Sequence, residues 1–261
     1  MRLARIAWAF LRSAVQHELA YRADFFGNVV RSLLGTGTAF GGLMVVFSHT
    51  ESLGDWNFPQ MLGLLGVFYV VQGVMAVFMS PSLNKTVEEV REGTFDYILV
   101  KPVPSQFIAS TRRFVLWHVT DVALGVAIIV IAAGRLEDKV TLMDVLVFLA
   151  MIFTALSIVY AMWLSLTTLV FWWVRMENVT MIFNVFYETG RYPVEIFPFW
   201  LRQALTFIFP VAFITTVPAR AITGREASWL TWIAPIVAIV VVLAASKFWR
   251  IGLSRYSSAS S

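Results

Sequence analysis

The chain has 261 residues, of which 59% are hydrophobic and 14% are charged, with a formal net charge of +4 and no cysteine. Soluble domains are roughly half apolar and about a quarter charged, so this chain has too little polar surface for a water-soluble globule, and we expect its solvent to be lipid. The absence of cysteine excludes disulfides, thiolate metal sites and cysteine nucleophiles, and the small net charge gives no indication of a nucleic-acid partner.

Residues 1–24 are predicted to form an amphipathic helix rather than a cleavable signal. Four arginines interrupt the region where a signal peptide needs an uninterrupted apolar core. Apolar residues recur with helical spacing from Leu3 to Leu19, and the arginines lie mostly off this stripe. The pattern favours a helix in the membrane interface before the first span, and a helix packed on protein would show the same pattern.

Six apolar segments are candidates for membrane spans, since a span needs about 20 apolar residues. They cover residues 25–48, 59–80, 114–133, 142–163, 197–222 and 229–247. The first of them contains a G-x-x-x-G pattern at Gly37 and Gly41, which is typical of close helix packing within a chain or across a dimer. The sequence therefore predicts an all-α integral membrane protein of about six transmembrane helices, in a single domain over residues 1–261.

The lysines and arginines of the short loops indicate the orientation, because cytoplasmic loops carry an excess of both. With the N-terminus inside, the cytoplasmic loops and termini hold fourteen basic residues and the outer loops hold three. We therefore expect both termini in the cytoplasm, together with the polar segment 81–113.

The proline-rich segment 193–223 allows two paths. In one, residues 172–197 form a cytoplasmic loop and residues 198–222 cross the membrane once, which the distribution of basic residues mildly favours. In the other, the chain crosses outward earlier, through the short "VTMIFNVFYETG", and the segment dips partway back as a re-entrant hairpin. Prolines and arginines within an apolar segment favour broken helices that line protein or a cavity. Such a hairpin would form an outer gate, with Arg202, Pro210 and Pro218 as candidate gate residues.

The chain lacks the motifs of the common enzymes. It has neither the G-x-x-x-x-G-K-[ST] loop that binds nucleotides nor the G-x-S-x-G elbow of hydrolases. Its three histidines are too dispersed for an obvious metal site. We therefore expect no catalytic, cofactor-binding or metal-binding residues in this chain.

His118 and Asp121 form a candidate buried polar pair. They are three residues apart on the third predicted span and would share one face of a helix. One interpretation is a proton relay of the kind that a proton-coupled transporter needs, and the other is a hydrogen-bonded pair in the first turns of the span. A single pair falls short of the series of groups that such relays use.

The segment "KTVEEVREGTFDYILVKPVP", residues 85–104, is the longest polar interruption of the chain. Thr86 and Glu89 have the spacing of a capping box, and Gly93 stands where a left-handed C-terminal cap belongs. We therefore predict a short helix over residues 87–92, followed by Phe95 and Tyr97 as exposed aromatic side chains.

A short capped helix beside aromatic anchors favours a docking site for a partner protein. A helix lying on lipid headgroups is the alternative, but its acidic side chains would face anionic lipid. The candidate docking residues are Val87, Glu88, Glu89, Arg91, Glu92, Phe95 and Tyr97.

Three segments, in this order, resemble the ABC-2-type permeases, which are the membrane subunits of ABC exporters. They are "REGTFDYILVKPVPSQF", "GRYPVEIFPFWLRQALTFIFPVAFITTVPARAITG" and the terminal "GLSRYSSAS". The resemblance covers essentially the whole chain. It implies a multi-pass protein of the bacterial plasma (inner) membrane that pairs with itself or with a second, related permease. It also implies two separate ATPase subunits, which would bind the ATP and the Mg²⁺.

The resemblance assigns roles to two segments. Residues 87–92, with Phe95 and Tyr97, correspond to the coupling helix that sits in a groove of the ATPase. A re-entrant hairpin falls within residues 198–223 and favours the second path above. Two other functions stay open from the residues alone. A proton-coupled secondary transporter would have related halves, which residues 1–130 and 131–261 do not show, and a non-transporting scaffold would need no docking loop.

Overall fold

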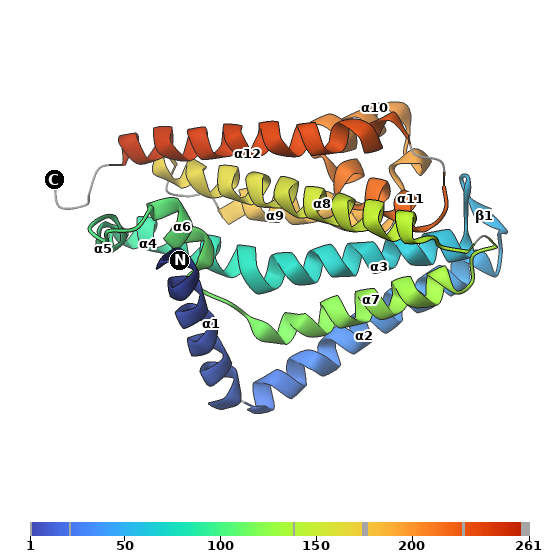
Figure 1. Cartoon of the computed structure of the whole chain (residues 1–261), viewed down its shortest axis with the longest axis horizontal. Helices are drawn as coiled ribbons and strands as arrows, with labels where there is room; N and C mark the ends of the chain where they lie inside the picture. Colours follow the sequence, from blue (N-terminus) through green and yellow to red (C-terminus); the bar gives the residue numbers. More distant parts are fainter. Residues whose placement is uncertain (1, 21, 138, 174–176, 226–227, 257–261) are drawn as a thin grey trace.

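The computed structural model describes residues 2–20, 22–137, 139–173, 177–225 and 228–256. Within these ranges the chain is almost entirely helical, and the one sheet is an antiparallel hairpin of β1 (Ser52–Leu53) and β2 (Trp56–Asn57). The predicted all-α fold is therefore confirmed. Figure 1 shows the long helices side by side along one axis, with α4, α5 and α6 near one end and β1 at the other.

The longer elements begin with α1 (Arg2–Ala20), α2 (Arg22–Phe47), α3 (Phe58–Val74), α4 (Ser80–Glu92), α5 (Asp96–Leu99), α6 (Ser105–Thr111) and α7 (Val119–Ala133). They continue with α8 (Leu142–Thr168), α9 (Glu177–Glu188), α10 (Phe199–Gln203), α11 (Val217–Ile222) and α12 (Trp229–Arg255). Short π-helical turns are η1 (Met75–Met79), η6 (Ala204–Ile208) and η7 (Ala212–Thr216), and short 3₁₀ turns are η2 (Leu116–His118), η3 (Leu169–Phe171), η4 (Thr189–Arg191) and η5 (Val194–Ile196).

The predicted spans correspond to helices of the structure. Five helical stretches in the described ranges are long and apolar enough to cross a membrane, namely Phe25–Phe47, Phe58–Glu92, Leu116–Ala133, Leu142–Phe171 and Trp229–Arg255. The pair Phe199–Ile208 and Ala212–Ile222 is bent by 77° at its break, and it counts as a sixth span if it is one broken helix but not if it is a re-entrant loop. The five stretches follow the order of the predicted spans, although the second runs twelve residues beyond the predicted end at residue 80.

The predicted capping box at Thr86 is wrong. The helix does not begin there, because α3, η1 and α4 form one helical stretch of 35 residues, and Thr86 lies fully buried in its last third. The Thr86 hydroxyl donates to the carbonyl of Ser82 at 3.1 Å, as a hydroxyl inside a helix commonly does. The other end agrees with the prediction, since Gly93 adopts φ 70° and its N–H donates to the carbonyl of Val90.

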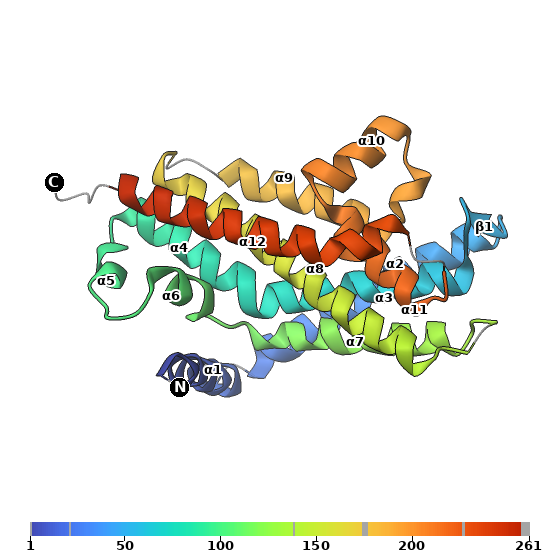
Figure 2. The same cartoon turned by 45° about the horizontal axis from the view of Figure 1, so that its top comes forward.

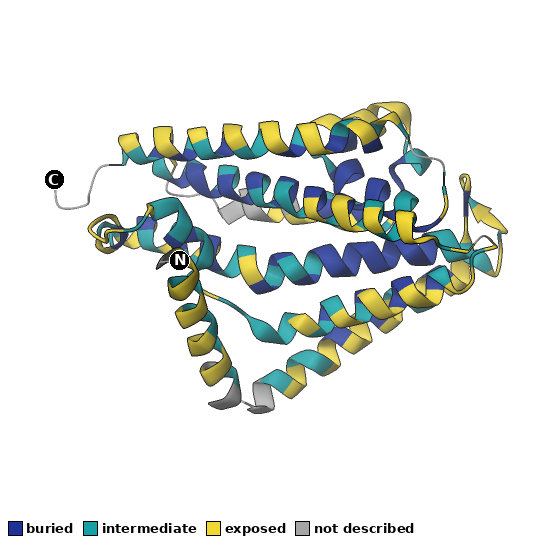
Figure 3. Cartoon of the chain, in the orientation of Figure 1, coloured by how far each residue is buried: buried dark blue, intermediate teal, exposed yellow. Residues whose placement is uncertain are grey.

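The helix α3 is the centre of the bundle, and every residue from Met61 to Val71 is buried (Figure 3). Close contact with α7 depends on two glycines. A Cβ added at Gly125 would lie 2.7 Å from both the carbonyl oxygen of Gly66 and the amide nitrogen of Val70. Any larger residue there would push the two backbones apart. The glycines of the first span differ, since a Cβ at Gly37 or Gly41 would meet no atom within 4 Å.

The helix α1 runs across the long axis of the bundle, and Figure 2 shows it nearly end-on. The amide of Leu116 in η2 donates to the carboxylate of Glu18 at 3.3 Å and ties α1 to the bundle. The predicted helix is therefore present, and its direction is the one that a helix in the membrane interface would take relative to the spans.

The proline-rich segment doubles back on itself. Glu195 and Arg220 form an ion pair at 2.8 Å, whereas one straight helix would separate them by roughly 37 Å, at 1.5 Å per residue. Ile196 lies close to Gly54 in the β1–β2 turn, and the guanidinium of Arg225 donates to Gln60 next to the same hairpin. Both ends of the segment thus lie at the β1–β2 end of the molecule. The segment therefore folds back, as the hairpin path predicts, and does not form one straight helix. Its course through the membrane stays a prediction.

Candidate functional site

The predicted docking loop forms an exposed tip at the end of the molecule where α4 and α12 finish (Figures 1 and 2). Three apolar side chains on and beside α5 point outward, Tyr97, Leu99 and Val100, and we call them the α5 tip. Tyr97 is 74% exposed and Val100 is 81% exposed. The fourth residue of this run, Ile98, is buried and holds α5 to the bundle.

Phe95 is not an exposed anchor, and that part of the prediction is wrong. Its side chain is fully buried, and its ring lies 5.7 Å from the ring of Phe171, 6.3 Å from that of Trp249 and 5.6 Å from that of Tyr256. The physical reason is the left-handed turn at Gly93, after which the chain reverses and Phe95 points back into the bundle.

The other predicted docking residues divide into two groups. Glu88, Arg91 and Glu92 are exposed on α4, and Glu88 pairs with Lys85 at 2.8 Å. Val87 and Glu89 are half-buried and contact the chain itself. Sequence reasoning left Val100 out of the docking residues, although an uninterrupted apolar run in a polar loop is the signal that could have identified it.

Arg112 holds the base of the docking loop against α4. Its guanidinium donates to the carboxylate of Glu89 and, at 2.9 Å, to the hydroxyl of Thr86. Next to it the amide of Arg113 donates to the Ser82 hydroxyl, which in turn donates to the Arg113 carbonyl. These contacts join the end of α6 to α4, so the α5 tip is held on a rigid base.

The predicted pair of His118 and Asp121 is present. The Nδ1 atom of His118 lies 2.7 Å from the Oδ2 atom of Asp121. The hydroxyl of Ser32 donates to the other carboxylate oxygen of the buried Asp121. These contacts tie α2 to α7, and Ser32 could not be predicted because it lies 89 residues away in the sequence.

The candidate gate residues lie at three different places in the hairpin. Pro210 stands at the bend, between η6 and η7, and Pro218 is buried in the first turn of α11. Arg202 is exposed, and its guanidinium donates to the carbonyls of Glu195 at 2.7 Å and Phe197 at 3.4 Å. The charged guanidinium of Arg202 is therefore hydrogen-bonded to backbone oxygens of the same hairpin.

Sequence reasoning missed the contacts that hold the hairpin closed. The ion pair of Glu195 and Arg220 joins its two ends, and the guanidiniums of Arg220 and Arg225 lie 6.0 Å and 4.6 Å from the centre of the buried ring of Trp56. Burial, together with the neighbouring Arg220, lowers the pKa of Arg225 from its ordinary value. Two cations share one aromatic ring here, so removing Arg220 should affect the position of the hairpin.

The described residues hold no group of three or more His, Asp or Glu side chains that could bind a metal ion. Helices of this length and hydropathy define a multi-pass membrane protein.

The family model described as "ABC-2 family transporter protein" matches residues 33–260, so the chain belongs to this family of ABC transporter proteins. No curated protein and no solved structure matches the chain significantly. Membership makes the chain a permease component of an ABC-type transporter, a membrane component that does not itself catalyse a reaction.

Proposed function

We propose that the chain is the membrane-spanning permease subunit of an ATP-driven exporter, and that a separate ATPase subunit docks on the α5 tip. Family membership supports the permease role. The observation that carries the docking is the exposure of Tyr97 and Val100 on a loop rich in charged residues, beyond the apolar spans. Exposed apolar groups in a polar surrounding mark protein interaction sites.

The surface around the α5 tip suits a protein partner. Exposed charges of both signs, Glu88, Arg91, Glu92 and Lys101, form a polar rim around an apolar centre, which is the usual anatomy of a protein interface.

The tip is also connected to the centre of the bundle. The helical stretch Phe58–Glu92 ends beside it and passes through the buried core as α3. Closure of the ATPase on ATP would therefore move this stretch and tilt the spans that pack on it. ATP and Mg²⁺ would bind to the partner, and the residues of this chain would transmit the movement.

The permease would function as a dimer, either with itself or with a second, related permease. The open face around Gly37 and Gly41 supports a helix partner there, because small residues allow close approach of helices in a membrane. The single domain over residues 1–261 would lie in a bacterial plasma (inner) membrane. The α5 tip and both termini would lie in the cytoplasm.

The orientation has a direct test, because the chain has no cysteine. We expect Tyr97→Cys to stay unlabelled when intact cells are treated with a membrane-impermeant thiol reagent, and to be labelled after the cells are opened. Trp229→Cys, an exposed position near the β1–β2 end, is the matched outer control. Labelling of Tyr97→Cys in intact cells would reverse the proposed orientation.

The docking surface is tested by the double variant Tyr97→Ala, Val100→Ala. Truncation of a docking hot spot costs about 2 kcal/mol, so the affinity for the ATPase should fall roughly 30-fold. We expect the variant to insert and to unfold at the wild-type temperature, because both side chains are exposed, but to lose the ATPase on copurification. The control is Trp200→Ala, an exposed aromatic residue in the hairpin. Wild-type copurification of the double variant would contradict the proposed docking surface.

A proton-coupled secondary transporter is the second candidate, and the contact of His118 with Asp121 is the observation that favours it. Transport by the purified chain alone, driven by a proton gradient and abolished in Asp121→Asn, would support it. Transport that requires the ATPase and ATP would support the first proposal, and a chain that binds the ATPase without transport would be a scaffold.

A further inference from the structure

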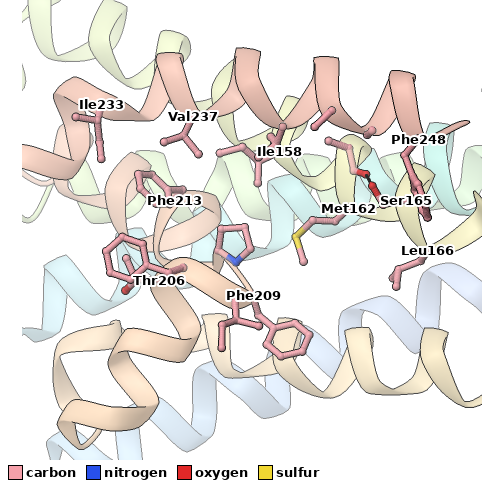
Figure 4. A pocket seen from close by; sticks show the side chains of 17 residues that line it. Ile158, Met162, Ser165, Leu166, Thr206, Phe209, Phe213, Ile233, Val237 and Phe248 are labelled. Carbon is pink, nitrogen blue, oxygen red and sulfur yellow. Dashed lines mark hydrogen bonds between the residues drawn. The ribbon is translucent and has the colours of Figure 1, made fainter. Parts of the chain in front are cut away.

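An apolar cavity of about 690 Å³ lies between α8, α12 and the bent hairpin (Figure 4). Each of the three elements contributes to its wall. The side chains of Ile158 and Met162 come from α8, those of Val237 and Phe248 from α12, and those of Phe209 and Phe213 from the hairpin. Ligand sites in proteins have volumes of about 300–1,000 Å³, so the cavity is large enough to hold part of a small organic molecule.

The lining is uncharged and offers few polar groups. None of the seventeen residues that line the cavity is ionisable. The two hydroxyl groups, on Ser165 and Thr206, donate their hydrogens to the carbonyls of Ala161 at 2.8 Å and Arg202 at 2.7 Å. A sugar, a cation or an anion would lose its hydration here without equivalent partners. The lining therefore matches an uncharged, apolar ligand.

The cavity is held open by aromatic stacks. At the bend of the hairpin, the ring of Phe209 stacks on that of Phe186 from α9, with ring centres 3.8 Å apart. At the other end, the ring of Phe248 stacks on that of Trp172 at 5.3 Å. Pro210, next to Phe209, stiffens the bend between η6 and η7. Because Phe186 and Trp172, which do not line the cavity, hold the two lining rings in place, the space between the helices is preformed.

The side of the cavity opens where the molecule meets its surroundings. Phe207 and Ile208 line it and are also largely exposed, as is Ala244 on α12. Ala244 belongs to α12, which is long and apolar enough to span a membrane, and Phe207 and Ile208 belong to the bent pair, whose two helices meet the same criterion only together. In a bilayer, the medium at this opening is acyl chains.

We propose that this cavity binds one acyl chain of a bilayer lipid, which enters from the side between α12 and the hairpin while the headgroup stays outside. Its uncharged lining, its position along the spans and its fixed aromatic walls support this ligand. The bound acyl chain would contact Phe207 and Phe209 and so stabilise the first limb of the bent hairpin. This inference does not depend on the docking of an ATPase.

The test uses the full chain in nanodiscs of phosphatidylcholine, of which a small fraction carries a photoreactive diazirine in the middle of one acyl chain. After illumination, the modified residues are mapped by mass spectrometry. We expect several-fold more adducts on Met162 and Phe207, which line the cavity, than on Leu243, which is exposed on α12 outside it.

A filling substitution at the opening gives the decisive comparison. Ala244→Trp should reduce the adducts on Met162 and Phe207 several-fold, whereas Leu243→Trp, at the neighbouring position outside the lining, should leave them unchanged. Ala244→Leu is the milder variant if the tryptophan lowers the yield of folded protein. In native mass spectrometry, the wild type and Leu243→Trp should retain one lipid per chain that Ala244→Trp loses.

Three results would overturn the proposal. Adducts distributed evenly over all exposed helix faces would mean that the cavity holds only bulk lipid. Adducts on Met162 that persist in both Ala244 variants would place the acyl chain elsewhere. Protection of Phe207 from every lipid adduct, together with a dimer of the chain in native mass spectrometry, would mean that a second copy covers the opening.

Discussion

Replacing Phe95 with alanine should destabilise the protein by about 3–5 kcal/mol, the usual cost of truncating a buried phenylalanine. The side chain is fully buried, and three aromatic rings surround it. Because Phe171 ends the α8 segment and Trp249 belongs to α12, the cavity left by the substitution would loosen two long helices together. Thermal unfolding in detergent micelles measures this loss.

The neighbouring Tyr97→Ala is the matched control, since it removes an aromatic ring two residues away that is 74% exposed. We expect it to keep the wild-type unfolding temperature. Phe95→Ala should also weaken ATPase docking, but only as a consequence of a loosened tip. If Phe95→Ala unfolded like the wild type and still lost the ATPase, Phe95 would be a docking anchor after all, and the buried position would be wrong.

These two residues illustrate what the sequence could and could not predict at this site. Both are aromatic, both follow Gly93, and local pattern offers no means to decide which one is exposed. The direction of each depends on where the chain lies after the turn, and therefore on α12, whose Trp249 is more than 150 residues away. The location of the exposed loop was predictable, but its contact residues were not.

The spans were predictable because their signal is local. Length and apolarity decide whether a helix suits a membrane, and the helices occur where these properties indicated. The boundary at residue 80 failed for a tertiary reason. Ser82 and Thr86 look like residues of a loop, yet their hydroxyls hydrogen-bond inside the bundle to Arg113 and Arg112, which directly follow α6. The polar sequence could therefore continue as a buried helix.

The path of the hairpin needed more than composition. The count of basic residues mildly favoured a straight crossing, because Arg175 and Arg191 suggested a cytoplasmic loop. Arg175 lies outside the described residues. In the structure, the guanidinium of Arg191 pairs with Glu188 at 2.7 Å and lies 5.0 Å from the centre of the Phe68 ring. A basic residue that protein contacts neutralise carries little information about topology. The resemblance to a known family favoured a hairpin, and the ion pair of Glu195 and Arg220 joins the two ends of a segment that folds back.

That ion pair leads to the second large effect, which we expect from Arg220→Met. The side chains of Arg220 and Glu195 are 17% and 25% exposed. Exposed ion pairs contribute about 0–1 kcal/mol, and breaking a buried pair costs about 3–5 kcal/mol, so we expect a loss of about 2–3 kcal/mol for the closed hairpin. The open population should then rise roughly 30- to 140-fold.

The rate at which a cysteine at Thr216 reacts with a thiol reagent reports this opening. Thr216 is buried in the hairpin, and its hydroxyl accepts from the amide of Val194 at 3.4 Å. In a Thr216→Cys background, Arg220→Met should accelerate labelling by the same factor as it raises the open population. Adding Glu195→Gln should recover part of the loss, because the single variant leaves a carboxylate half-buried without Arg220.

Arg202→Met is the matched control. This exposed arginine belongs to the same hairpin and, in the described contacts, donates only to backbone oxygens. Its replacement should change the labelling rate little. An equal or larger acceleration in Arg202→Met would mean that Arg202, and not Arg220, keeps the hairpin closed. No acceleration in either variant would mean that packing, and not charge, keeps the hairpin closed.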